Sequence, residues 1–140
     1  MQKNNKNAFT LLELLVVISI IGILITLGAT AYSTAQKKGR DAKRKSDIKT
    51  MQNGFEEYYS KNTLYPTTTT LAGSDNTIFP SGLPTDPKNS GNYVYTYGLG
   101  STSYCICSLL ENSTGNASAL PSGTTCSFGT GSYYCLSSLQ

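Results

Sequence analysis

Few side chains in this 140-residue sequence offer groups suited to acid–base or nucleophilic reactions. The chain contains no His, which is the commonest general base and a frequent metal ligand. Ser-His-Asp triads, Cys-His dyads and His-ligated metal sites are therefore excluded. The carboxylates form no recognisable catalytic constellation. We expect a protein that is not an enzyme, with an enzyme tethered to a membrane by its N-terminal segment as the alternative.

The four cysteines are the remaining reactive groups, and all of them lie near the C-terminal end: Cys105, Cys107, Cys126 and Cys135. In a small, weakly charged region they are most simply two disulfides, which form in an oxidising compartment. Zinc is the alternative, but Cys-x-Cys is shorter than the usual spacing and no His is available. A bond between Cys105 and Cys107 is disfavoured because residues two apart on a strand stand too far apart for easy closure. The other two connectivities remain open, and we predict no metal and no cofactor.

Glu13 is an unusual carboxylate because 22 uncharged, mostly apolar residues, 14–35, follow it directly. As a helix they would be roughly 33 Å long, enough to cross a hydrocarbon core of about 30 Å. A carboxylate costs roughly 2.5–3.5 kcal/mol at mid-bilayer and has no role in an ordinary secretory signal peptide. Glu13 either rests at the headgroup boundary or needs a buried cation as its partner.

Residues 37–62 predict a polar helix with one apolar stripe. Apolar side chains recur at steps of three and four residues, namely Ile48, Met51, Phe55 and Tyr58 or Tyr59. Pro66 ends the helix near residues 62–65. Seven Lys or Arg and two Asp lie between Lys37 and Lys49. We interpret them as a solvated helix face and predict no specific nucleic-acid site.

Residues 63–140 predict a small antiparallel sheet with long loops. Polarity alternates over 93–97 and around 104–107, which indicates two short strands joined through Gly98 and Gly100. Asp75 and Asp86 are interpreted as ordinary loop residues. The predicted fold is α+β, with one long N-terminal helix packed on this sheet; the first half of the helix spans a membrane and the second half is amphipathic.

Residues 8–17, Ala-Phe-Thr-Leu-Leu-Glu-Leu-Leu-Val-Val, resemble the prepilin signature of type IV pilins and type II secretion pseudopilins. In that family an inner-membrane peptidase cuts on the cytoplasmic side before the Phe and then N-methylates the new terminus. The resemblance implies cleavage between Ala8 and Phe9, with Ala8 at the position where Gly is usual. Glu13 can then neutralise the Phe9 amine of its own chain or of a neighbouring subunit.

The resemblance continues, less specifically, to about residue 97, where the sequence is similar to the major pseudopilin. It implies four segments: a leader, 1–8; a transmembrane and filament-core helix, 9–36; its amphipathic continuation, 37–62; and an extracytoplasmic β domain with two disulfides, 63–140. Some major pseudopilins bind calcium in their C-terminal loops. Here Glu111 is the sole carboxylate after Asp86, so we predict no calcium site.

The implied function is a structural subunit of a type IV pilus-like filament, with the major pseudopilin of a type II secretion system as the alternative. The Cys-containing, Ser/Thr-rich end favours the pilus narrowly. Implied partners are further copies in a homo-oligomeric filament, a prepilin peptidase/N-methyltransferase, an assembly ATPase and an inner-membrane platform protein. The precursor would cross the inner membrane once, with a cytoplasmic N-terminus, and the lipid bilayer would hold it before assembly into an extracytoplasmic filament. The excess of Lys and Arg after the apolar segment opposes this orientation, whereas the cysteines and the leader favour it.

Overall fold

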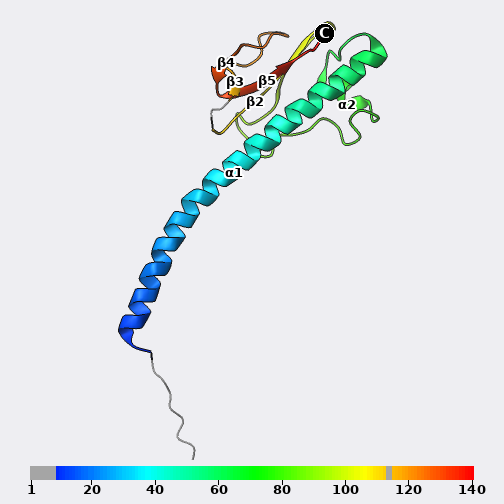
Figure 1. The fold of residues 1–140 in the computed structure, drawn as a ribbon. Coiled ribbons are helices and arrows are strands. Elements are labelled where there is room, and N and C mark those ends of the chain that lie inside the picture. The colour runs from blue at the N-terminus through cyan, green and yellow to red at the C-terminus, as the bar shows by residue number, and fades with distance from the viewer. Residues whose placement is uncertain (1–8, 113–114) are drawn as a thin grey trace, which may run out of the picture. The chain divides into compact units, whose positions relative to one another are not determined.

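The computed structural model describes residues 9–112 and 115–140 (Figure 1). The chain divides into two compact units, one ending at Gln36 and one beginning at Lys37. Helix α1, Leu11–Asn62, contributes residues to both. The other elements all lie in the second unit: α2, Thr69–Ser74; β1, Thr96–Leu99; β2, Tyr104–Leu109; β3, Gly115–Ala117; β4, Phe128–Gly131; and β5, Tyr133–Ser137. The predicted α+β fold is confirmed.

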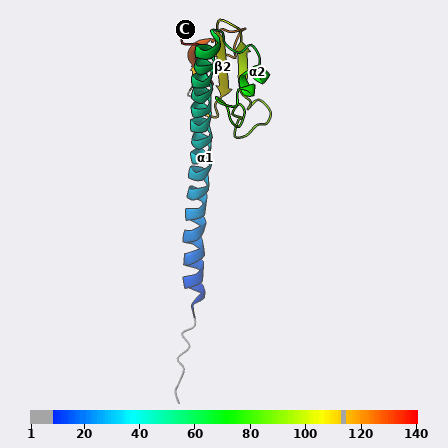
Figure 2. The ribbon, with the colours of Figure 1, turned by 90° about the vertical axis from the view of Figure 1, so that its right-hand side faces the viewer.

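The strands form one sheet in the order β1-β2-β5-β3-β4, with every neighbouring pair antiparallel. Strand β2 is buried on both faces. Tyr104 and Ile106 belong to the core shared with α1, whereas Cys105 and Cys107 belong to a second cluster with Ala117. This division follows from the alternation of side chains along a strand. In Figure 2 the sheet lies beside the C-terminal part of α1.

The main core forms where α1 meets the sheet. Ile48, Met51 and Phe55 are fully buried, which confirms the predicted apolar stripe. Phe55 packs edge-on against Tyr104, with ring centroids 5.0 Å apart, and such aromatic pairs add to the free energy gained by burial. The stripe continues with Tyr59 rather than Tyr58, because Tyr59 packs against this core.

The first predicted strand is shifted along the sequence. The structure has β1 at Thr96–Leu99, so residues 93–95 precede it. Tyr93 and Tyr95 instead contact α1: the Tyr95 hydroxyl donates to Asp47, and the Tyr93 ring stacks against the guanidinium of Arg44. Gly98 lies inside β1 rather than in a turn. A Cβ at this position would overlap the carbonyl oxygen of Gly123, so the close backbone approach requires a glycine.

Two disulfides are present, as predicted, and the structure selects one of the connectivities that the sequence left open. Cys105 bonds to Cys126, and Cys107 bonds to Cys135. The second bond joins residues that face each other across β2 and β5. Asn116 supports this arrangement because its side-chain amide donates to the carbonyl oxygen of Cys135 and accepts from its N–H. The amide thus extends the ladder between β3 and β5.

Helix α1 ends at Asn62, within the predicted range. The next residue, Thr63, has a φ of 59°, and its N–H donates to the carbonyl oxygen of Tyr59 over 2.7 Å. This is the left-handed conformation that usually ends a helix and that glycine adopts without steric cost. A β-branched residue is strained there.

Thr63→Gly should therefore increase the free energy of unfolding by about 0.5–1 kcal/mol, because the relieved strain exceeds the added chain entropy of the unfolded state. Urea unfolding followed by tyrosine circular dichroism would measure the change. Thr70→Gly is the control, since Thr70 is an exposed residue inside α2. Glycine within a helix should lower the free energy of unfolding. Equal destabilisation by both substitutions would contradict the strain at Thr63.

Candidate assembly site

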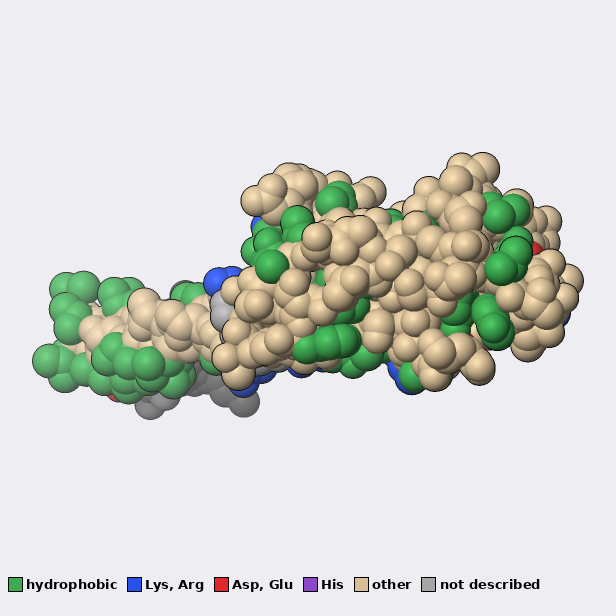
Figure 3. Space-filling model, turned by 90° about the horizontal axis from the view of Figure 1, so that it is seen from above, with side chains coloured by type: hydrophobic (Ala, Val, Ile, Leu, Met, Phe, Trp, Pro, Cys, Tyr) green, Lys and Arg blue, Asp and Glu red, His purple; other side chains and the backbone are tan. Residues whose placement is uncertain are grey.

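The first unit presents an apolar helix surface that no described residue covers. All residues from 9 to 39 are exposed, including Phe9 at 89% and Leu11 at 87%. Hydrophobic side chains gather over this part of the molecule (Figure 3). Helix α1 contains a stretch long and apolar enough to cross a membrane, by length and composition. An exposed apolar patch of this size indicates a membrane or protein contact.

Four hydroxyl groups within this surface are satisfied inside the helix. Ser19 donates to the carbonyl oxygen of Leu15, and Thr26 donates to that of Ile23, each over 2.8 Å. Thr30 and Thr34 make the same kind of bond to the preceding turn. The segment therefore presents few unsatisfied polar groups to lipid or to an apolar protein surface.

Glu13 forms a capping box with Thr10 at the start of α1. Its carboxylate accepts hydrogen bonds from the backbone N–H and the hydroxyl of Thr10, over 2.9 and 2.8 Å. The Thr10 hydroxyl in turn accepts from the Glu13 N–H over 3.2 Å. The Thr-x-x-Glu spacing before an apolar run is the signal for this motif, and our sequence reasoning missed it. Phe9 precedes the box directly, and Ala8 lies outside the described residues.

An ionic cluster organises the second unit around Arg44, which is fully buried. Its guanidinium donates to Asp86 over 2.7 and 3.1 Å, to Asp41 over 2.8 Å and to Glu111 over 2.9 Å. Arg40 adds a bidentate pair to Glu111 with both distances at 2.7 Å. The cluster joins α1 to the loop before β1 and to the segment after β2. Bidentate guanidinium–carboxylate pairs give such a junction a defined geometry.

The electrostatics of this cluster favour the ionised carboxylates. Hydrogen bonds from Arg40, and then from Arg44, lower the pKa of Glu111 to about 2. Burial raises the pKa of Asp41 and of Asp86, but the hydrogen bonds that each accepts outweigh it and leave both pKa values below the usual range. Desolvation is thus overcome by specific partners.

Two sequence interpretations are corrected by this cluster. Asp86 is not an ordinary loop residue, because it is a buried partner of Arg44. The basic run is not simply a solvated face, because Arg44 points into the protein. The sequence contained one signal for this pairing. Residues 63–140 carry only four charged side chains, and a charge in so weakly charged a region favours a buried ionic partner. Asp75 does lie in a loop, where it accepts from the Thr77 N–H and hydroxyl.

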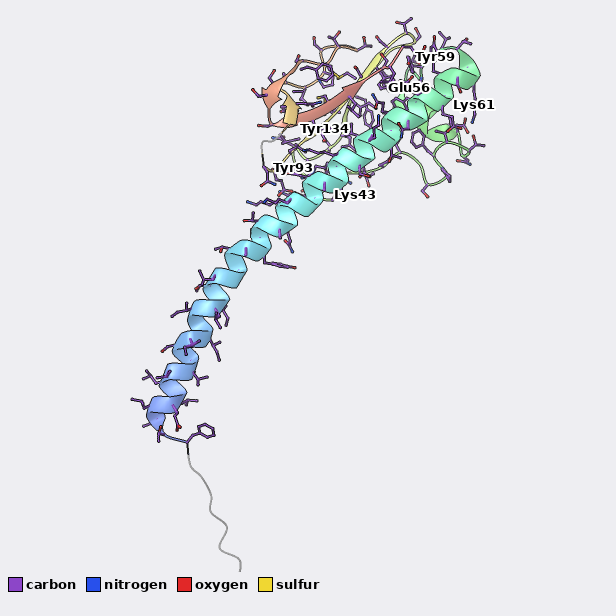
Figure 4. All side chains as sticks on the ribbon, in the orientation of Figure 1. Lys43, Glu56, Tyr59, Lys61, Tyr93 and Tyr134 are labelled. Atoms are coloured by element: carbon purple, nitrogen blue, oxygen red, sulfur yellow. A yellow bond between two sulfur atoms is a disulfide. The ribbon has the colours of Figure 1, made fainter. Side chains whose placement is uncertain are left out.

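A second polar contact joins α1 to the sheet and to the C-terminal residues. The Glu56 carboxylate accepts from the hydroxyls of Tyr104 and Tyr65, over 2.8 and 2.9 Å, and from the Leu139 N–H over 3.0 Å. Glu56 projects from the last turns of α1 (Figure 4). Burial, followed by the bond to Glu56, raises the pKa of Tyr65 to about 12. These bonds hold the end of the chain against the helix.

The cysteines and the carboxylates of the ionic cluster are committed to bonds within the protein. The four cysteine sulfurs lie within 4.8 Å of one another, but each sulfur is bonded in a disulfide, so none is a thiolate ligand or nucleophile. The carboxylates of the ionic cluster are occupied by Arg40 and Arg44. The apolar surface with Glu13 at its beginning is a candidate contact site, because it is exposed along its whole length.

The exposed apolar surface lies in a part of the chain that is similar to known proteins. Residues 3–29 match the prokaryotic N-terminal methylation motif. The chain is 41% identical over 68 residues to type II secretion system core protein G of Aeromonas hydrophila, covering 49% of this chain and 48% of that protein. It is 34% identical over 90 residues to the core protein G of Escherichia coli, covering 64% and 59%, and 32% identical over 90 residues to that of Pseudomonas aeruginosa, covering 64% and 61%.

The chain thus spans about half to three fifths of the length of these curated relatives. No solved structure gives a significant match. The methylation motif covers the capping box and most of the exposed apolar surface, and the relatives share a single description. The motif and these relatives therefore support the predicted resemblance to the family of type IV pilins and type II secretion pseudopilins.

Proposed function

We propose that this protein is a non-catalytic structural subunit of a pseudopilus-like filament in a type II secretion system. Its similarity to core protein G of several bacteria carries this proposal. The relatives favour the pseudopilin over the pilus subunit that the sequence alone favoured narrowly. The N-terminal methylation motif supports a membrane-anchored precursor that is processed before assembly.

In this proposal the precursor crosses the inner membrane through residues 9–36, with its N-terminus in the cytoplasm. A prepilin peptidase/N-methyltransferase then cuts between Ala8 and Phe9. The exposed apolar surface moves from lipid into a filament core made of the same helix from other copies. Lipid and filament core are comparably apolar, so this transfer needs an external energy source, supplied by an assembly ATPase acting through a membrane platform protein. Repetition of one head-to-tail contact generates a helical polymer.

The role of Glu13 follows from the charge that cleavage creates. A new ammonium group at Phe9 would lie at the N-terminal end of α1, where the helix dipole disfavours a cation. In an apolar surrounding that cation needs an anion. The Glu13 carboxylate is held at this end by Thr10, and the Thr10 N–H remains an amide after cleavage, so the capping box persists. Glu13 then neutralises the amine of its own chain or of the next subunit.

The mature N-terminus is the first test of this proposal. Mass spectrometry of the protein from sheared filaments or membranes should find an N-terminal peptide that begins with N-methylated Phe9. This result is expected because the cut before Phe9 exposes the amine that the methyltransferase modifies. A product that begins at Ala8 or earlier, or after Ala31, would contradict the proposal.

A type IV pilus subunit is the second candidate, favoured by the two disulfides that close the C-terminal region. The genomic neighbourhood discriminates the two candidates. Genes for a secretin and a secretion channel beside this one would support the pseudopilus. A gene for a retraction ATPase would support the pilus instead.

A further inference from the structure

The second unit contains a small groove at its beginning, close in sequence to the apolar segment. It has a volume of about 320 Å³ and is lined by Lys38, Asp41, Ala42, Lys45 and Asn112. Residues 38, 42 and 45 share one face of α1 because they are four and three residues apart. The groove thus presents two lysines one above the other, with Asn112 contributed by the segment after β2.

The groove has a net positive character although it contains a carboxylate. One Asp41 oxygen accepts from Arg44 and from the Glu111 N–H, and the other accepts from the N–H and side-chain amide of Asn112, over distances of 2.7 to 3.0 Å. Both oxygens are therefore occupied. Among the described residues Lys38 forms no ion pair with a carboxylate, and the Lys45 ammonium lies 5.5 Å from the centroid of the Tyr134 ring. The chemistry of the groove suits an anion.

The sequence places this groove where a membrane surface would supply that anion. Lys37 and Lys38 directly follow the uncharged segment, and Tyr32, five residues earlier, is 67% exposed. Tyrosine is enriched at membrane–water interfaces, and lysines beside a membrane span attract anionic headgroups. Lys38 and Lys45 follow the last residue of the predicted span, residue 36, by two and nine residues in the sequence.

We propose that this groove binds the phosphate of an anionic phospholipid headgroup while the subunit is in the bilayer. The inference rests on the proposed function, because it requires that residues 9–36 span a membrane. Lys38 and Lys45 supply the charge, and the side-chain amide of Asn112, which donates one hydrogen to Asp41, has a second hydrogen for the phosphate. Entry into a filament removes the subunit from the bilayer, so assembly must break this lipid contact.

The test uses the purified full chain in a nonionic detergent and native mass spectrometry with short-chain lipids. Phosphatidylglycerol should bind at least about tenfold more tightly than phosphatidylcholine, because two lysines contribute to attraction of the anionic headgroup. The double variant K38Q/K45Q should lose this preference. The charge-matched variant K49Q/K61Q, with both substitutions on exposed positions of α1 outside the groove, should keep it.

Several outcomes would overturn the inference. If both double variants lost the preference for phosphatidylglycerol equally, the lipid would be attracted by the overall positive charge of the protein and not by a specific site. Inorganic phosphate that binds as tightly as phosphatidylglycerol would show a site for free anions. The single variant K38Q keeps the test valid if the double variant misfolds, because Lys38 is exposed. K38Q should lose part of the preference for phosphatidylglycerol, and a K38Q protein with the full preference would contradict the groove. Failure of lipid binding in protein that begins with methylated Phe9 would overturn the groove and leave the proposed function standing.

Discussion

Arg44→Met should lower the free energy of unfolding by about 3–5 kcal/mol, the range found when one partner of a buried ionic cluster is removed. Methionine fills much of the volume but leaves Asp41, Asp86 and the inner oxygen of Glu111 without the guanidinium that they share. Buried carboxylates without a cation are costly. Urea unfolding of the full chain in detergent, followed by near-ultraviolet circular dichroism of its ten tyrosines, would measure the loss.

Two further variants separate this effect from a simple loss of charge. Lys49→Met makes the same change of net charge on the same helix at an exposed position, and should change stability little. The free energy of unfolding of Arg44→Lys should lie between those of Arg44→Met and Lys49→Met. One ammonium group cannot reproduce the planar guanidinium, which donates twice to Asp86 and once to Asp41. Wild-type stability of Arg44→Met would show that the cluster does not support the fold.

Glu13→Gln should reduce filament yield at least about tenfold while the precursor remains in the membrane and is still cut. Glutamine keeps the capping box, because its side-chain oxygen can accept from Thr10 as the carboxylate does. It removes the negative charge that the Phe9 amine needs in an apolar filament core, and an unpaired buried charge of this kind costs several kcal/mol. Immunoblots of sheared filaments and of membrane fractions would measure the yield and the precursor.

The matched control for this charge is Glu57→Gln. Glu57 is exposed on the last part of α1 and pairs with Lys61 four residues later, and exposed ion pairs of this kind contribute little to stability. Its substitution should leave filament yield unchanged. If Glu13→Gln assembled as well as this control, the amine–carboxylate pairing would be refuted and Glu13 would be reduced to a helix cap.

The sequence alone was sufficient for features that depend on local patterns. The uncharged stretch after Glu13 predicts a membrane-length helix because length and hydropathy set that property residue by residue. Ile48, Met51 and Phe55 reveal the buried face of α1 because the helical period places them on one side. Pro66 indicates where the helix must already have ended. The residues around Phe9 carry the family resemblance in one continuous run.

The tertiary structure decided which distant groups meet. Arg44 bonds to Asp86, 42 residues away, and to Glu111, 67 residues away, and neither pairing follows from local periodicity. The disulfide connectivity and the position of β1 were likewise open, because both depend on strand register. Tyr95 shows why: its alternating sequence fits a strand, but its hydroxyl gains a buried bond to Asp47 on α1. Long-range pairing of buried polar groups outweighed local preference, since leaving such groups unpaired costs more than a short strand gains.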